Sequence, residues 1–139
     1  MGYGSGDGSF QAAGGEAGIR RMVTRFYELM ATREIARDIR AMHPADLSVS
    51  CDKLATFLCG WLGGPRLYQA KYGSISIPGV HAHLAVDAAA RDAWLAIMAE
   101  AVAEQDWAAD FKHYLLAQLA VPAERVRAVY EELRAQEQH

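Results

Sequence analysis

The 139-residue sequence has little of several features that mark particular protein classes. It holds two cysteines, Cys51 and Cys59, whose spacing fits neither a disulfide scaffold nor the CxxC motifs of zinc and redox sites. The formal net charge of -3 argues against a nucleic-acid-binding protein that relies on phosphate contacts. Charged residues interrupt every apolar run before it reaches membrane-spanning length, and no secretory leader is recognisable. We therefore expect no membrane association and a cytoplasmic location.

Motifs of several common enzyme classes are also missing. The sequence contains no GxSxG nucleophile motif, and no GxGxxG or Walker loop follows a strand. What it does contain is 52% hydrophobic and 22% charged residues, which is typical of a folded globular domain. Residues 1–11 are rich in glycine and predict a flexible tail, so we place a single folded domain at 12–139.

Apolar residues recur at helical spacing along most of that domain. From Ile19 to Met30 they follow the i, i+3, i+4, i+7 pattern of an amphipathic helix. Similar patterns predict helices at about 33–42, 47–61, 88–102 and 107–119, and Pro122 is expected to begin a separate terminal helix. Residues 65–80 are expected to form an ordered loop between helical turns. The fold class is therefore all-α.

A few polar residues lie within these apolar stripes and are the candidates for chemistry. They are Tyr27, His43, Ser50, His81, His83 and Trp94. Each alone is more often a satisfied core residue than a ligand. His81 and His83 suit a metal pair on a strand, but on a helix two residues so spaced point in different directions, so only one of them can reach a buried centre.

Several motifs in order resemble the group II truncated haemoglobins. Gly14-Gly15 precedes the first long helix, Phe26-Tyr27 lies within it, and a His-Pro-x-Asp-Leu motif occupies 43–47. The motifs WLGGPRLY at 61–68 and RDAWL at 91–95 follow, and the resemblance covers about 12–120. It implies a globin-like fold, the truncated 2-on-2 helical sandwich, and a haem b (iron protoporphyrin IX) held without covalent attachment.

The resemblance also implies the residue that binds the iron. Without gaps between Gly63-Gly64 and Trp94, the family's proximal histidine falls on His81. A neutral imidazole whose second nitrogen donates to a carbonyl suits this role. His83 then stands in place of a proline of the family.

On the opposite, distal side of the haem, the resemblance implies that Tyr27, His43, Ser50 and Trp94 surround the ligand. Oxygen becomes partly negative when it binds ferrous haem, so the Tyr27 hydroxyl and the Trp94 indole N–H would stabilise it by donating hydrogen bonds. Small Ser50 leaves a route for ligand entry. Such a pocket favours tight oxygen binding with slow release over bulk delivery.

The remaining haem contacts that the resemblance implies are mostly apolar, with cationic or hydroxyl partners for the propionates. They are Lys53, Leu54, Phe57, Leu58, Trp61, Arg66, Tyr68, Leu84, Val86 and Met98. The arginines that usually precede the proximal histidine are missing, since this chain has Ser76-Ile77-Pro78-Gly79-Val80 there.

The implied function is binding of oxygen, carbon monoxide and nitric oxide, with nitric oxide dioxygenase or peroxidase-like chemistry as further activities that need a separate reductase. The protein would be a monomer or a homodimer, and the terminal helix could pack between subunits. Two alternatives stay open at this point. One is a non-haem metal protein that uses His43, His81 and His83, although no carboxylate completes such a site. The other is a cofactor-free helical interaction module.

Overall fold

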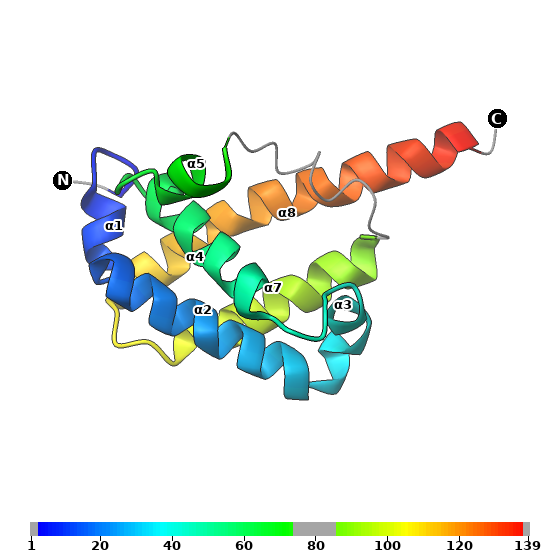
Figure 1. The fold of residues 1–139 in the computed structure, drawn as a ribbon, viewed down its shortest axis with the longest axis horizontal. Coiled ribbons are helices and arrows are strands. Elements are labelled where there is room, and N and C mark those ends of the chain that lie inside the picture. Colours follow the sequence, from blue (N-terminus) through cyan, green and yellow to red (C-terminus); the bar gives the residue numbers. More distant parts are fainter. Residues whose placement is uncertain (1–2, 74–85, 138–139) are drawn as a thin grey trace.

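A computed structural model describes residues 3–73 and 86–137, and within these ranges the chain is helical without any strand (Figure 1). The elements are α1 (Gly8–Ala12), α2 (Gly15–Thr32), the 3-10 turn η1 (Glu34–Ala36), α3 (Arg37–Ala41), α4 (Ser48–Trp61), α5 (Leu67–Tyr72), α7 (Ala88–Ala103) and α8 (Ala109–Glu137). The all-α class is therefore confirmed. None of the helices in the described ranges has the length and apolarity to cross a membrane.

The four long helices form two packed pairs. Helix α2 packs against both α4 and α7, α7 packs against α8, and the short α5 lies against α4 (Figure 1). One pair is thus α2 with α4 and the other is α7 with α8, which is the 2-on-2 arrangement expected from the sequence. Phe26, Met22, Met98 and Phe111 fill the core between the pairs.

Helix α2 carries the pattern that the sequence predicted. Its apolar positions are at most 9% exposed, and they are Ile19, Met22, Val23, Phe26, Tyr27, Leu29 and Met30. Burial of this stripe, rather than intrinsic propensity, is what holds such a helix in place. Because Tyr27 belongs to this buried stripe, the packing of α2 also fixes the position of the Tyr27 side chain.

Helix α4 presents two different faces. Ala55, Leu58 and Cys59 are completely buried in the core. Leu54 and Phe57 are only half-buried, on a neighbouring side of the helix. The difference arises because helical positions three and four apart share a face, and this helix has two such sets. The half-buried set forms one wall of the site described below.

The N-terminal segment is packed more closely than a flexible tail would be. Residues 8–12 are helical, Ser9 is 1% exposed, and the Tyr3 hydroxyl donates to Asp110 at 2.8 Å. The Phe10 amide donates to the Leu62 carbonyl at 3.0 Å. The phenyl ring of Phe10 packs directly on Gly64. A Cβ at Gly64 would lie only 2.4 Å from the Cδ1 atom of Phe10. The sequence expectation overlooked these anchors because glycines surround them.

Helix α8 differs from its prediction as well. The expected break at Pro122 does not occur, and one helix runs from Ala109 to Glu137 with Pro122 inside it. An interior proline costs about 3 kcal/mol because it removes one hydrogen bond and crowds the preceding turn. Buried Leu119 and Val126 on either side hold the helix against the core across this position. Tertiary contacts therefore override the local signal.

Candidate functional site

A cluster of aromatic side chains forms where α2, α4 and α7 meet. Tyr27 of α2 is 9% exposed, and its hydroxyl lies 3.4 Å from the Ser50 carbonyl oxygen of α4. Trp94 of α7 stands edge-on to Phe26, with ring centroids 5.3 Å apart, and Phe26 in turn contacts Tyr27 at 5.1 Å. Three helices thus bring together Tyr27, Ser50 and Trp94, which lie far apart in the sequence.

Within the described residues, the two hydrogen-bond donors of this cluster make at most one long hydrogen bond. The 3.4 Å separation between the Tyr27 hydroxyl and the Ser50 carbonyl is longer than a usual O–H···O bond. Burial raises the pKa of Tyr27 well above its ordinary range, with a smaller contribution from nearby Cys51, so the phenol keeps its proton. The indole N–H of Trp94 donates to none of the described residues. Both groups are suited to donate to a small ligand.

His43 joins the cluster with a defined orientation. Its Nδ1 lies 2.8 Å from the Ile39 carbonyl oxygen, and its ring stands edge-on to Tyr27 with centroids 5.7 Å apart. Because a carbonyl oxygen only accepts hydrogen bonds, Nδ1 must carry the proton. In the neutral ring Nε2 is then an acceptor. The imidazole expected here is present, and its Nδ1–H is directed to the Ile39 carbonyl rather than towards Tyr27.

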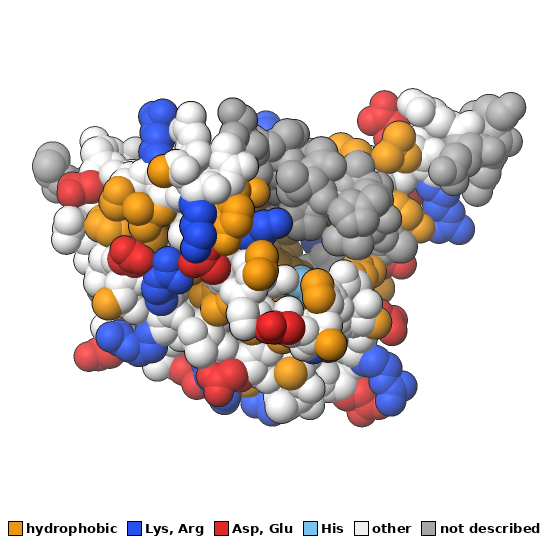
Figure 2. Space-filling view, viewed as in Figure 1, with side chains coloured by type: hydrophobic (Ala, Val, Ile, Leu, Met, Phe, Trp, Pro, Cys, Tyr) orange, Lys and Arg blue, Asp and Glu red, His pale blue; other side chains and the backbone are white. Residues whose placement is uncertain are grey.

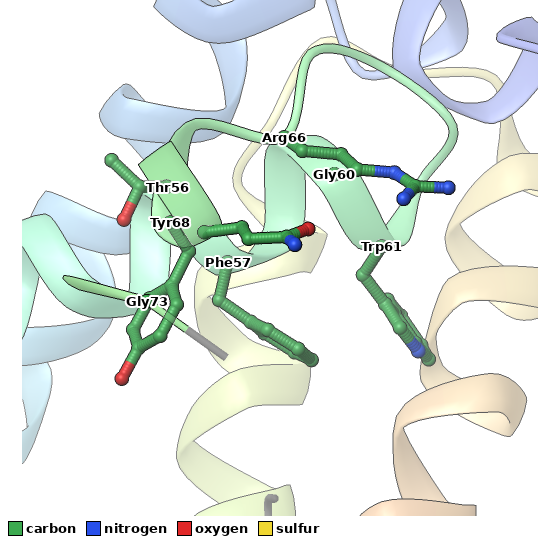
Figure 3. A pocket seen from close by; sticks show the side chains of 8 residues that line it. Thr56, Phe57, Gly60, Trp61, Arg66, Tyr68 and Gly73 are labelled. Atoms are coloured by element: carbon green, nitrogen blue, oxygen red, sulfur yellow. The ribbon is translucent and has the colours of Figure 1, made fainter. Parts of the chain in front are cut away.

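A hollow of about 340 Å³ lies alongside, between α4 and α5 (Figure 3). Its lining includes Phe57, Trp61, Arg66 and Tyr68, four of the residues that the sequence assigned to cofactor binding. The rings of Phe57 and Trp61 extend from α4 in the same direction and stack at 6.2 Å, while Tyr68 stands edge-on to Phe57. Gly60 lies close to the chain before α5, since a Cβ there would make a tight contact of 3.3 Å with the Arg66 Cα.

The other residues expected to contact the haem differ in how deeply they are buried. Leu54 and Val86 are half-buried beside the core, and Lys53 is exposed. Leu58 and Met98 are completely buried, so they lie behind the wall of the site rather than on its surface. His81, His83 and Leu84 lie outside the described residues.

A polar network beside the hollow was not predicted from the sequence. The carboxylate of Asp52 accepts hydrogen bonds from Lys71 Nζ at 2.8 Å, from the Tyr72 hydroxyl at 2.5 Å and from Arg20 Nη1 at 3.1 Å. Lys71 and then Tyr72 lower the pKa of Asp52 to about 2. This network ties α5 and α2 to α4, and Lys53 adds its ammonium 5.4 Å from the centre of the Tyr72 ring. No local pattern reveals contacts between residues so far apart in the chain.

The chemistry of these residues fits a flat, largely apolar molecule with an anionic edge. Half-exposed Leu54, Phe57 and Trp61 offer aliphatic and aromatic surface that the protein itself leaves uncovered. Arg66 beside them and Lys53 nearby supply positive charge. Figure 2 shows cationic side chains next to hydrophobic ones on this face of the molecule. A porphyrin with two propionates has this combination of properties.

Comparison with known proteins identifies the class. The bacterial-like globin family matches residues 8–127, and the chain therefore belongs to that family. A solved group II 2-on-2 haemoglobin from Agrobacterium tumefaciens is 36% identical, with a TM-score of 0.82 over 86% of this chain and 92% of that one. The cold-adapted truncated haemoglobin from Pseudoalteromonas haloplanktis TAC125 is 31% identical, with a TM-score of 0.82 over 85% of this chain and 95% of that one. A truncated oxygen-avid haemoglobin from Bacillus subtilis is 26% identical, with a TM-score of 0.77 over 85% of this chain and 97% of that one.

Within the bacterial-like globins, the chain is a group II truncated haemoglobin, as its motifs indicated. It is a haem-binding globin. This membership favours the haem interpretation over the non-haem metal protein and the cofactor-free module that the sequence left open.

Proposed function

We propose that this globin binds haem b between α4 and α7, with His81 as the axial ligand and with Tyr27 and Trp94 on the side where a diatomic gas binds. The observation that carries the proposal is the convergence of Tyr27, Ser50 and Trp94 from three helices, with two weakly engaged donors among them. The assignment of His81 rests on its spacing from Gly63-Gly64 and Trp94 in the sequence.

The walls of the haem site come from the half-buried apolar residues. Leu54, Phe57, Trp61 and Val86 would contact the porphyrin, and Leu84 is expected to join them. Completely buried Leu58 and Met98 support these contacts from behind. Lys53, Arg66 and Tyr68 would bind the propionates, which matters because arginines before His81 are missing.

The haem supplies the iron at which oxygen, carbon monoxide or nitric oxide binds. The protein contributes the hydrogen bonds. To reach the ligand, the Tyr27 hydroxyl has to give up only its long contact with the Ser50 carbonyl. The Trp94 N–H has no competing described acceptor. A hydrogen bond to a charged or partly charged group contributes about 1.5–3 kcal/mol, so each donor slows oxygen release by roughly tenfold or more.

This pocket supports oxygen retention rather than bulk delivery. The similar Bacillus subtilis haemoglobin is described as oxygen-avid, which agrees with the two donors seen here. Nitric oxide oxidation and peroxide-dependent chemistry are the further activities that we assign to the same pocket, with a separate reductase to return the iron to its ferrous state. The cytoplasmic location expected from the sequence belongs to the same proposal.

Haem titration of the purified protein tests the cofactor and its ligand. The ferrous protein with carbon monoxide should show a sharp Soret band, and a protein that stays colourless after haem addition would contradict the proposal. His81→Gly should lose the native spectrum, and added imidazole should restore it by occupying the vacated position.

Two variants serve as matched controls for the ligand assignment. His83→Ala and His113→Ala, the second on the exposed surface of α8, should both keep the wild-type spectrum. If His83→Ala loses the spectrum and His81→Gly keeps it, the gap-free placement of the axial ligand is wrong.

A further inference from the structure

The last turns of α8 lie beyond the part of the chain that matches the globin family. The family match ends at residue 127, whereas α8 continues to Glu137 and extends away from the body of the molecule (Figure 1). Residues 131–136 are all exposed. A helix of this length without packing partners is marginal in water, because most helical stability in proteins comes from tertiary contacts. Residues 131–136 therefore gain little stabilisation from packing on the described part of the chain.

Helix α8 also exposes aliphatic side chains, at Val121 within the family match and at Leu133 beyond it. Among the described residues, the exposed large hydrophobic side chains are Ile35, Val49, Val121 and Leu133, and two of these four lie on α8. Val121 is 53% exposed and Leu133 is 39% exposed. At 3.6 residues per turn they lie about 120° apart around the helix axis. The arc between them contains Arg125, Glu132 and half-buried Val129.

Two charged side chains on that arc are exposed. Arg125 and Glu132 are exposed and form no ion pair with any described residue. The neighbouring charges behave differently, since Glu124 pairs with both Arg91 and Arg127 on another side of the helix. Arg125 and Glu132 thus have no ion-pair partner in the described part of the chain, and they lie two turns apart between two exposed aliphatic side chains.

We propose that α8 pairs in antiparallel orientation with α8 of a second copy of this chain, about a two-fold axis near residues 127–128. Val121 and Leu133 lie at equal distances on either side of Arg127, so each Val121 would contact the partner's Leu133. Arg125 and Glu132 are centred between residues 128 and 129, about one and a half residues further along, so the long side chain of Arg125 would reach the partner's Glu132 across this axis. The reverse pair forms by symmetry.

The orientation follows from the charges. A parallel pair in register would place the Arg125 side chains of the two copies together, and likewise their Glu132 side chains, which is unfavourable. The antiparallel pair replaces both repulsions with attractions. Because one helix from each copy makes a small contact area, we expect a reversible dimer with a dissociation constant of the order of micromolar rather than a permanent one.

Charge reversal at the two unpaired positions tests this pairing on the full-length, haem-loaded protein. Sedimentation velocity from about 5 to 500 µM should show the mass of wild-type protein rising towards twice that of one chain. Arg125→Glu and Glu132→Arg should each raise the dissociation constant at least tenfold. The double variant R125E/E132R should return it to near the wild-type value.

Mixing the two single variants gives the sharpest result. Each one repels itself, but an equimolar mixture of Arg125→Glu and Glu132→Arg should form heterodimers with two attractive pairs. Arg21→Glu, at an exposed position on α2 outside any ion pair with described residues, is the control and should dimerise as wild type does. Circular dichroism of each variant verifies that the helices are intact. A wild-type protein that stays monomeric, or single variants whose mixture associates no better than each alone, would overturn the proposal.

Discussion

Replacement of Trp94 by phenylalanine isolates the contribution of a single hydrogen-bond donor. The indole ring stands edge-on to Phe26 with centroids 5.3 Å apart and an interplanar angle of 64°. A phenyl ring can keep that contact while it removes the N–H group. The change in packing is therefore small, and the change in ligand stabilisation is large.

The expected magnitude follows from the environment of the donor. The Trp94 N–H has no hydrogen-bond acceptor among the described residues, and in our proposal it donates to the ligand. Loss of a hydrogen bond worth about 1.5–3 kcal/mol corresponds to a rise in the dissociation rate of roughly ten- to one-hundred-and-fifty-fold. The association rate should change far less, because ligand entry does not depend on this bond.

Stopped-flow replacement of oxygen by carbon monoxide measures this rate directly. Trp107→Phe is the matched control, because Trp107 packs on Phe111 at the start of α8, away from the cluster, and its replacement should leave the rate unchanged. An unchanged oxygen dissociation rate in Trp94→Phe, with the haem spectrum intact, would remove Trp94 from the set of ligand donors and refute the reasoning.

Three further variants probe other parts of the account. Tyr27→Phe keeps the contact with Phe26 but loses the hydroxyl, so oxygen should dissociate about tenfold or more faster in the same assay; a slower rate would show that the phenol opposes binding. Arg66→Ala should speed haem transfer to an apoglobin acceptor without changing oxygen release, and equal transfer rates would exclude a propionate contact. Asp52→Asn tests the network that lowers this carboxyl pKa from 3.8 to about 2. A lowered pKa stabilises the fold above the unfolded-state value and loses that effect as pH falls towards 2. Urea unfolding should therefore show that wild type is more stable than Asp52→Asn near pH 5. The difference in unfolding free energy should shrink as the pH falls towards 2. A difference that does not depend on pH would contradict the role given to the Asp52 carboxylate.

The parts of the fold that the sequence predicted are those governed by neighbouring residues. The stripe on α2 is buried as expected, and Asp87 caps α7 by accepting a hydrogen bond from the Ala90 amide at 2.9 Å. Helix α4 ends at Trp61 as predicted, and Gly63 follows with φ +94°, where a Cβ would lie 2.0 Å from the Gly6 carbonyl oxygen. Periodicity, caps and glycine turns act over a few residues and can be read directly.

Features that depend on long-range contacts were predicted less well. The Asp52 network joins residues from three helices, and the Tyr3–Asp110 bond spans most of the chain. Pro122 carries a local signal for a helix start, yet packing on both sides keeps α8 continuous. In each case the deciding energy comes from partners that no local window contains.

The candidate site shows the same division. Resemblance to a family named Tyr27, Ser50 and Trp94, and the structure brings them together. The orientation of His43, with Nδ1 turned to the Ile39 carbonyl, could only be found from the structure. The two faces of α4 likewise separate the residues that fill the core from those that line the crevice.

A crystal structure of the haem-loaded protein with carbon monoxide bound tests the central claim most directly. We predict a porphyrin between α4 and α7, the His81 imidazole on the iron, and the Tyr27 hydroxyl and Trp94 N–H turned towards the gas on the opposite face. An iron held by His83 or His43, or a ligand surrounded by neither donor, would contradict it.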